Sequence, residues 1–90
     1  MKYEWDNNKA EINLSKHGVS FEEAKTVFDD LFYIDFYDPD HSIGEHRYIL
    51  LGQSQQGRLL FISYMERDDA TRIISARQAT ASERKSYEQN

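Results

Sequence analysis

Residues 46–79 read HRYILLGQSQQGRLLFISYMERDDATRIISARQA, in which β-branched and aromatic residues are frequent. Such residues favour strands, so the sequence predicts strands over 46–54, 58–67 and 71–79. Only Gln55-Gln56-Gly57 and Asp68-Asp69-Ala70 separate these segments. Parallel neighbours would need a crossover of about a dozen residues or more. The three segments are therefore expected to form antiparallel hairpins.

Further elements are predicted on both sides of these strands. Residues 31–37 are aromatic and β-branched up to the turn Asp38-Pro39-Asp40, which indicates a fourth strand. Before it, a helix that begins at the N-cap Ser20 is indicated by apolar residues at helical spacing, namely Ala24, Val27, Phe28 and Leu31. Thr80 and Glu83 have the spacing of a capping box, which predicts a final helix that ends at about Glu88.

The first residues of the chain predict a strand and a helix. In residues 1–5, alternation places Met1, Tyr3 and Trp5 on one side. Asp6 is a suitable N-cap for a helix over 7–17 that ends at Gly18, with an apolar side formed by Ala10, Leu14 and, less cleanly, Ile12. The order β-α-α-β-β-β-β-α predicts one α+β domain over residues 1–90, with an antiparallel sheet, two N-terminal helices and one C-terminal helix.

Composition excludes several classes of chemistry. The chain has no cysteine, which removes disulfides, thiolate metal sites and thiol nucleophiles. It contains no apolar run of the roughly 20 residues that a membrane helix needs, and it begins with nothing that resembles a signal peptide. We therefore expect a soluble cytoplasmic protein.

The charge of the chain is unevenly distributed. The net charge of -5 is unfavourable for binding nucleic acid or an anionic membrane. However, five aspartates and no basic residue lie within 29–40, so the remainder of the chain is neutral. All six arginines lie in residues 41–90. Local arginine geometry, rather than the total charge, therefore determines whether a phosphate can bind.

Five arginines lie on or beside the predicted strands: Arg47, Arg58, Arg67, Arg72 and Arg77. A guanidinium binds phosphate through two parallel hydrogen bonds, so these side chains are candidates for a phosphate-binding surface. Strict alternation puts Arg77 on the face of Thr71 and Ile73, and Arg72 on the other. If Arg67 and Arg77 share a face, we expect them to converge near the same end of the sheet. The alternative is that the arginines are solvated or pair with neighbouring acids.

Two smaller groups of residues each have two interpretations. Lys16-His17-Gly18 suits a helix C-terminus, where cations meet the helix dipole and glycine forms the cap. The same lysine and histidine are also candidates for phosphate binding or proton transfer. Glu45 and Arg47 lie on the same face if a strand begins at this point. Glu45 is then either a general base beside Arg47, which would bind the phosphate, or its partner in a surface ion pair.

Histidines and acids also gather in the turn region, but they match no standard metal motif. The residues concerned are Asp38, Asp40, His41, Glu45 and His46. Their spacing is not that of a zinc or calcium site, so no metal site is predicted. No glycine-rich phosphate loop is present either, and no cofactor is expected.

The chain resembles the BrnT family of bacterial toxins over nearly its whole length. The resemblance is carried by Glu4-Trp5-Asp6, Lys9, Asn13, Lys16-His17-Gly18-Val19, Phe21, Ala24, Phe28, Gly44-Glu45, Arg47, Arg67, Arg72-Ile73-Ile74-Ser75-Ala76-Arg77, Glu83-Arg84 and Tyr87. It implies a RelE-like fold and a type II toxin that cleaves RNA. It also implies a BrnA-like antitoxin with a ribbon-helix-helix DNA-binding part, so that the toxin reaches operator DNA only through the antitoxin.

The resemblance also implies roles for individual residues. RNA cleavage of this kind needs no metal, because the 2′-hydroxyl attacks the adjacent phosphorus with help from a base, an acid and nearby cations. Arg67 and Arg77, with Arg47 and Arg72, would hold the phosphate. His17 or Glu45 would be the base, and Lys16 or His17 the acid. We expect the acidic segment 29–40 to face away from the RNA site and to meet a basic surface of the antitoxin. The alternative is a non-catalytic toxin-like module that binds an antitoxin and tunes operon repression.

Overall fold

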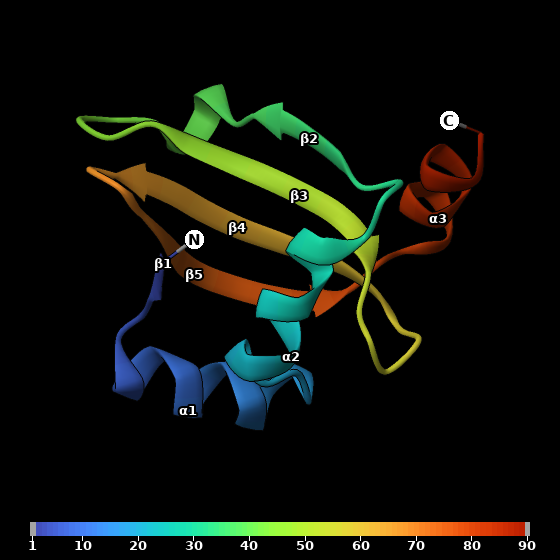
Figure 1. Cartoon of the computed structure of the whole chain (residues 1–90), viewed down its shortest axis with the longest axis horizontal. Coiled ribbons are helices and arrows are strands. Elements are labelled where there is room, and N and C mark those ends of the chain that lie inside the picture. Colours follow the sequence, from blue (N-terminus) through green and yellow to red (C-terminus); the bar gives the residue numbers. More distant parts are fainter. Residues whose placement is uncertain (1, 90) are drawn as a thin grey trace.

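The computed structural model describes residues 2–89, which form a five-stranded sheet with three α-helices (Figure 1). The elements, with two short 3-10 helices η1 and η2, are β1 (Lys2–Glu4), α1 (Asn7–His17), α2 (Phe21–Thr26), η1 (Val27–Asp29), β2 (Ile34–Tyr37), η2 (Pro39–His41), β3 (Arg47–Gln53), β4 (Leu59–Arg67), β5 (Ala70–Gln78) and α3 (Ala81–Glu88). The predicted α+β class is confirmed. Met1, part of the predicted first strand, lies outside the described residues. No helix within residues 2–89 is both long and apolar enough to span a membrane.

The sheet is mixed rather than antiparallel throughout. Its strand order is β1-β5-β4-β3-β2, and the pairs β2·β3, β3·β4 and β4·β5 are antiparallel as predicted. β1, however, runs parallel to β5, with Lys2 opposite Ala70 and Glu4 opposite Arg72. The prediction of an antiparallel sheet is therefore wrong for this strand. A short connector fixes the relative direction only of the two strands that it joins. β1 and β5 are far apart in the sequence, so no short connector determines how they pair.

Asn13 extends the edge of β5 beyond the end of β1. Its side-chain amide donates to the carbonyl oxygen of Ala76 at 2.8 Å and to that of Val19 at 2.9 Å, and its Oδ1 accepts the Ala76 N–H at 3.0 Å. The apolar pattern predicted Ile12 and Leu14 on the buried side of α1, but they are 64% and 52% exposed. Asn13 is the buried residue because it satisfies backbone groups that would otherwise be unpaired.

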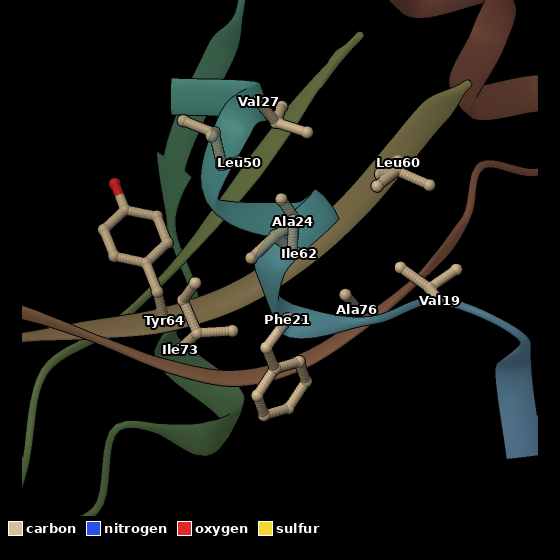
Figure 2. Close-up of a cluster of buried hydrophobic side chains, with 10 residues drawn as sticks. All are labelled: Val19, Phe21, Ala24, Val27, Leu50, Leu60, Ile62, Tyr64, Ile73 and Ala76. Atoms are coloured by element: carbon tan, nitrogen blue, oxygen red, sulfur yellow. The ribbon is translucent and has the colours of Figure 1, made fainter. Parts of the chain in front are cut away.

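The core lies between one face of the sheet and the segment that contains α2 and η1 (Figure 2). Its buried members are Val19, Phe21, Ala24, Val27, Leu50, Leu60, Ile62, Tyr64, Ile73 and Ala76. The predicted helix was expected to include Leu31, but α2 ends at Thr26 and Leu31 is 91% exposed. Asp30 accounts for this difference, because its carboxylate accepts the N–H groups of Phe32 at 3.0 Å and Gln53 at 2.8 Å and so turns the chain toward β2.

A β-bulge in β5 changes which side chains share a face. Ser63 pairs with Ser75 and Tyr64 pairs with Ile73, so Ile74 is the extra residue. Strict alternation placed Ile73 with Arg77 and put Arg72 on the other face, and this prediction is wrong. The bulge turns Ile73 into the core, where it is 1% exposed, and brings Arg72 onto the face of Arg77.

Arg58 is part of the packed structure rather than of a phosphate-binding surface. Its Nε donates to Glu23 at 2.9 Å, a second nitrogen bonds the other Glu23 oxygen, and it also donates to the Gly18 carbonyl at 3.0 Å. Glu23 is 4% exposed and accepts a further bond from Ser54 at 2.8 Å. The hydrogen bonds from Arg58 lower the pKa of Glu23 despite its burial. This pair ties the start of β4 to α2.

Candidate functional site

The face of the sheet opposite α2 carries cationic and hydroxyl side chains in rows that cross β3, β4 and β5. Three successive rows read Arg47-Met65-Arg72, Ile49-Ser63-Ser75 and Leu51-Phe61-Arg77. Arg47 and Arg72 therefore stand in one row, separated by two strand spacings or about 10 Å between backbones. Two serines occupy the middle row. The apolar members Ile49, Leu51 and Met65 are buried, whereas the arginines and serines are at least partly exposed. We call this face the open face, and it is the candidate site.

Arg67 and Arg77 do not converge. Arg67 pairs with Ala70 beside the β4–β5 turn, whereas Arg77 pairs with Phe61 near the other end of the hairpin. Their backbone positions are about 20 Å apart at the usual rise of a strand. The expectation that they meet at one end is wrong, because the end of a strand faces the beginning of its antiparallel partner. A single phosphate cannot contact both residues.

Arg77 is held by α3 and by the sheet. Its two terminal nitrogens each donate to Glu83 at 2.9 Å, and its guanidinium lies 4.0 Å from the ring centre of Phe61. The paired guanidinium lowers the pKa of Glu83, and the Glu83 carboxylate raises that of Arg77. Arg77 therefore links α3 to the open face.

The other arginines of this face differ in whether a carboxylate lies close to the guanidinium. Arg67 lies 3.5 Å from Glu45, and the side chains of this pair are 52% and 51% exposed. Arg72 lies 3.9 Å from Glu4. By contrast, the Arg47 guanidinium has no carboxylate within 4.0 Å among residues 2–89. Arg47 is thus the arginine of this face that is available to an anionic ligand.

Arg47 lines a groove of about 210 Å³. It is lined by Asp38, His41, Arg47, Ile49, Phe61, Ser63, Ile74 and Ser75. His41 Nδ1 lies 2.9 Å from Asp38 Oδ2, and the side chains are 67% and 16% exposed. A carboxylate in this position orients the imidazole ring, a common arrangement in proton transfer.

Sequence reasoning missed the Asp38–His41 pair, because those residues were considered only as metal ligands. Among the described residues, no three potential His, Asp or Glu ligands come together. The fold brings the pair to the beginning of β3, where the Asp38 N–H donates to the Arg47 carbonyl, and the spacing of the residues alone does not show this. Asp38 also belongs to the acidic segment expected to face away from the site. That expectation is wrong for Asp38, because it lines the same groove as Arg47.

A second groove of about 190 Å³ adjoins the first. Lys9, Ile12, Asn13, Lys16, His17, Ile74 and Ser75 line it. Lys16 and His17 lie in the last turn of α1, which Gly18 caps with a φ of 68°, as the helix-end interpretation predicted. Because both grooves share Ile74 and Ser75, His17 and Lys16 flank the bulge on one side, and Arg47 and His41 flank it on the other.

A hollow larger than these two grooves lies elsewhere, between α1 and α2. It measures about 330 Å³, and Glu11 and Glu22 are its only charged lining residues. Trp5 also lines it and packs edge-on against Phe21 at 5.9 Å, which agrees with a role for Trp5 in packing. An acidic hollow repels phosphate, so the two grooves of the open face are the better candidates.

These features define a small α+β protein with one packed sheet face and one open, cationic face that suits a phosphate-bearing ligand. The model of the family described as "Ribonuclease toxin, BrnT, of type II toxin-antitoxin system" matches residues 5–83. The chain therefore belongs to the BrnT family of ribonuclease toxins, as the resemblance of its motifs indicated. Toxins of this type have an antitoxin partner.

A solved structure agrees with this assignment. The chain is similar to the Brucella abortus ribonuclease toxin BrnT, whose crystal structure at 1.1 Å matches with a TM-score of 0.70. The two sequences are 23% identical over 89% of this chain and 97% of that chain. The match supports the mixed α+β fold. No curated protein sequence matches the chain significantly.

Proposed function

We propose that the open face binds RNA and cleaves it without a metal ion, in the manner implied by the RelE-like resemblance. One observation carries the proposal: the unpaired Arg47 guanidinium, two serines and two histidines surround the β5 bulge in two adjoining grooves. These side chains supply a phosphate anchor, hydroxyl hydrogen-bond partners and two imidazole rings that can serve as base and acid. The open face therefore holds the parts required for 2′-hydroxyl attack.

The phosphate is assigned to the region above Ser63 and Ser75. Arg47 approaches it from β3 and contributes two parallel N–H donors to the non-bridging oxygens. Lys16 adds a positive charge from the α1 side. These cations stabilise the negative charge that develops on the phosphoryl oxygens in the transition state.

Proton transfer is assigned to the histidines on either side of the bulge. His17 removes the proton of the 2′-hydroxyl, whose oxygen then bonds to phosphorus. The bond from phosphorus to the 5′-oxygen breaks, and His41, oriented by Asp38, donates a proton to that oxygen. The products are a 2′,3′-cyclic phosphate and a free 5′-hydroxyl. Glu45, the alternative base, is assigned to positioning Arg67, with which it pairs.

The remaining arginines are assigned to neighbouring phosphates of the RNA chain. Arg72 continues the row of Arg47, while Arg67 and Arg77 lie toward opposite ends of the face. Each lies near a carboxylate in the free protein, so binding by these residues requires exchange of that partner. We assign the partner protein to the BrnA-like class with a ribbon-helix-helix part, which contacts operator DNA, and we place the toxin in the cytoplasm.

A second candidate function is a non-catalytic module that only binds the antitoxin. Three of the four arginines on the open face lie within 4.0 Å of a glutamate, an arrangement that a purely structural surface would also have. The free Arg47 guanidinium and the histidine on each side of the bulge favour the catalytic function. Growth measurements distinguish the two candidates.

Expression of the toxin alone is expected to arrest bacterial growth. Arg47→Ala and His17→Ala are expected to relieve the arrest, because each removes a group assigned to the reacting phosphate. Arg84→Ala is the matched control, since Arg84 is an exposed residue of α3. A folded, well-expressed toxin that leaves growth unchanged would support the non-catalytic module and contradict the proposed ribonuclease site.

A further inference from the structure

The strand β2 forms an exposed edge of the sheet. It pairs with β3 on one side, and no strand within residues 2–89 pairs with its other side (Figure 1). An open edge presents backbone donors and acceptors that can pair with a further strand. Proteins often protect such edges with proline or charged side chains, especially lysine, whereas Asp35 is the only charged residue of the sequence IDFY at 34–37.

The register identifies the backbone groups that point outward. The Asp38 N–H donates to the Arg47 carbonyl at 2.9 Å, and this pair continues the β2–β3 register. Hydrogen-bonded and non-hydrogen-bonded pairs alternate along an antiparallel ladder. Ile34 and Phe36 therefore bond to β3, and the N–H and C=O groups of Asp35 and Tyr37 point away from the sheet.

Apolar side chains surround this edge. Leu31 and Phe32, in the turn before β2, are 91% and 73% exposed, and Phe36 on the strand is 48% exposed. Phe36 points to the open face, whereas Asp35 points to the face packed by α2, because alternate residues of a strand point to opposite sides. The edge therefore combines unpaired backbone groups with uncovered apolar surface.

The region around the β2 edge is negatively charged. No lysine or arginine occurs between Lys25 and Arg47. Within the segment 29–40, Asp29, Asp35 and Asp40 are exposed, whereas Asp30 and Asp38 are hydrogen-bonded. Of these, Asp35 lies on β2 itself and Asp40 lies in η2 just after it. Acidic side chains without a neighbouring cation favour a basic partner and repel the phosphates of RNA.

We propose that the antitoxin adds a basic, extended segment to the outer edge of β2. Its backbone pairs with Asp35 and Tyr37, a lysine or arginine lies beside Asp35, and an apolar side chain lies beside Phe36. The segment continues over Leu31 and Phe32 and covers them. The inference rests on the antitoxin partnership of the family rather than on the proposed ribonuclease site.

Amide hydrogen exchange of the toxin, alone and bound to the antitoxin protein of its own operon, tests this docking mode directly. The amides of Asp35 and Tyr37 are expected to exchange rapidly in the free toxin, because they face solvent. In the complex their exchange is expected to slow by about 100-fold or more, as in a paired strand. The amides of Ile34 and Phe36, already bonded to β3, serve as internal references.

Three variants separate backbone pairing from charge. Asp35→Asn removes the carboxylate and is expected to weaken antitoxin affinity by about threefold, with a reduced salt dependence. Asp35→Pro also removes the outward N–H and is expected to weaken affinity by more than tenfold, at a position where edge strands tolerate proline. Glu11→Gln, on α1 at the opposite edge, removes an exposed acid and is expected to leave affinity unchanged. If Asp35→Pro fails to fold, the exchange measurement on the wild-type toxin still shows whether the antitoxin pairs with the β2 edge.

Several outcomes would overturn the proposal. Unchanged exchange at Asp35 and Tyr37 in the bound toxin would place the antitoxin elsewhere. Protection that appears in the toxin alone as its concentration rises would identify a second copy of the chain as the occupant. Protection by an oligoribonucleotide would identify RNA. The ribonuclease proposal is tested separately. If the toxin without antitoxin does not arrest growth, but the amides of Asp35 and Tyr37 still become protected in the complex, the ribonuclease proposal fails and the docking proposal stands.

Discussion

Asn13 shows how a single polar side chain completes the sheet. β1 covers β5 only as far as Arg72, and the Asn13 amide then pairs with both backbone groups of Ala76. An apolar residue in its place would leave a buried N–H and C=O without partners. The position therefore requires an amide, a requirement that the apolar pattern of the helix does not reveal.

Replacing Asn13 with alanine is expected to lower the free energy of unfolding by about 3 kcal/mol, the usual range for buried groups that lose their partners. Urea unfolding measures the change. Asn8→Ala provides the control, because Asn8 is an exposed residue of the same helix. Equal losses for the two variants would show that the Asn13 contacts are not a source of stability.

At the scale of elements, the sequence predicted the hairpins well. Each observed bound of β3, β4 and β5 lies within one residue of the predicted bound, because periodicity and short turns are local signals. The Thr80–Glu83 capping box is also confirmed. The parallel pairing of β1, the exposure of Leu31 and the bulge at Ile74 were not predicted, since each depends on tertiary contacts. The bulge matters most for the site, because it places Arg72 on the open face.

The packing of η1 on the sheet depends on Gly52. A Cβ at this position would lie 2.8 Å from Val27 Cγ1 and 3.1 Å from Tyr33 Cβ. Gly52→Ala is therefore expected to lower the free energy of unfolding by about 1–3 kcal/mol through overpacking.

A double-mutant cycle in urea unfolding checks this cause. Val27→Ala removes the nearest atom, so the cost of Gly52→Ala is expected to be smaller on that background. Strictly additive losses would indicate that the alanine is disfavoured for a reason other than contact with Val27.

At the scale of the whole molecule, carboxylates paired with arginines link stability to pH. The pKa of Glu23 is lowered by its hydrogen bonds to Arg58, and that of Glu83 by its hydrogen bonds to Arg77. A carboxyl with a lower pKa in the folded state stabilises the fold above its unfolded pKa, which is about 4.3 for glutamate. This stabilisation is lost as the pH falls through the folded-state value.

Stability is therefore expected to decrease on acidification below about pH 5, as measured by urea unfolding between pH 3 and 7. Glu23→Gln is expected to be less stable at pH 7 and to show a shallower pH dependence. Glu88→Gln, which alters an exposed acid of α3, is expected to keep the wild-type profile. A Glu23→Gln profile parallel to that of the wild type would remove this pair as a source of the acid sensitivity.

The distribution of charge explains how an acidic chain can bind RNA. The net charge of -5 equals the charge of segment 29–40, which runs from η1 through β2 into η2. The open face carries the arginines of β3, β4 and β5, so in the proposed site the attraction for RNA is local. Asp38 is the exception, because it lies in the Arg47 groove beside His41.

The most direct test of the proposed site is cleavage of an oligoribonucleotide by the purified toxin in excess EDTA, compared with its Arg47→Ala and Arg77→Ala variants. We predict cleavage to products with 2′,3′-cyclic phosphate ends, with no cleavage of a 2′-deoxy substrate. Arg47→Ala is expected to lower the rate by about 100-fold or more, the usual effect of losing a donor to transition-state charge, and Arg77→Ala by less than about tenfold. Cleavage of the 2′-deoxy substrate, or an Arg47→Ala enzyme as fast as the wild type, would contradict the account.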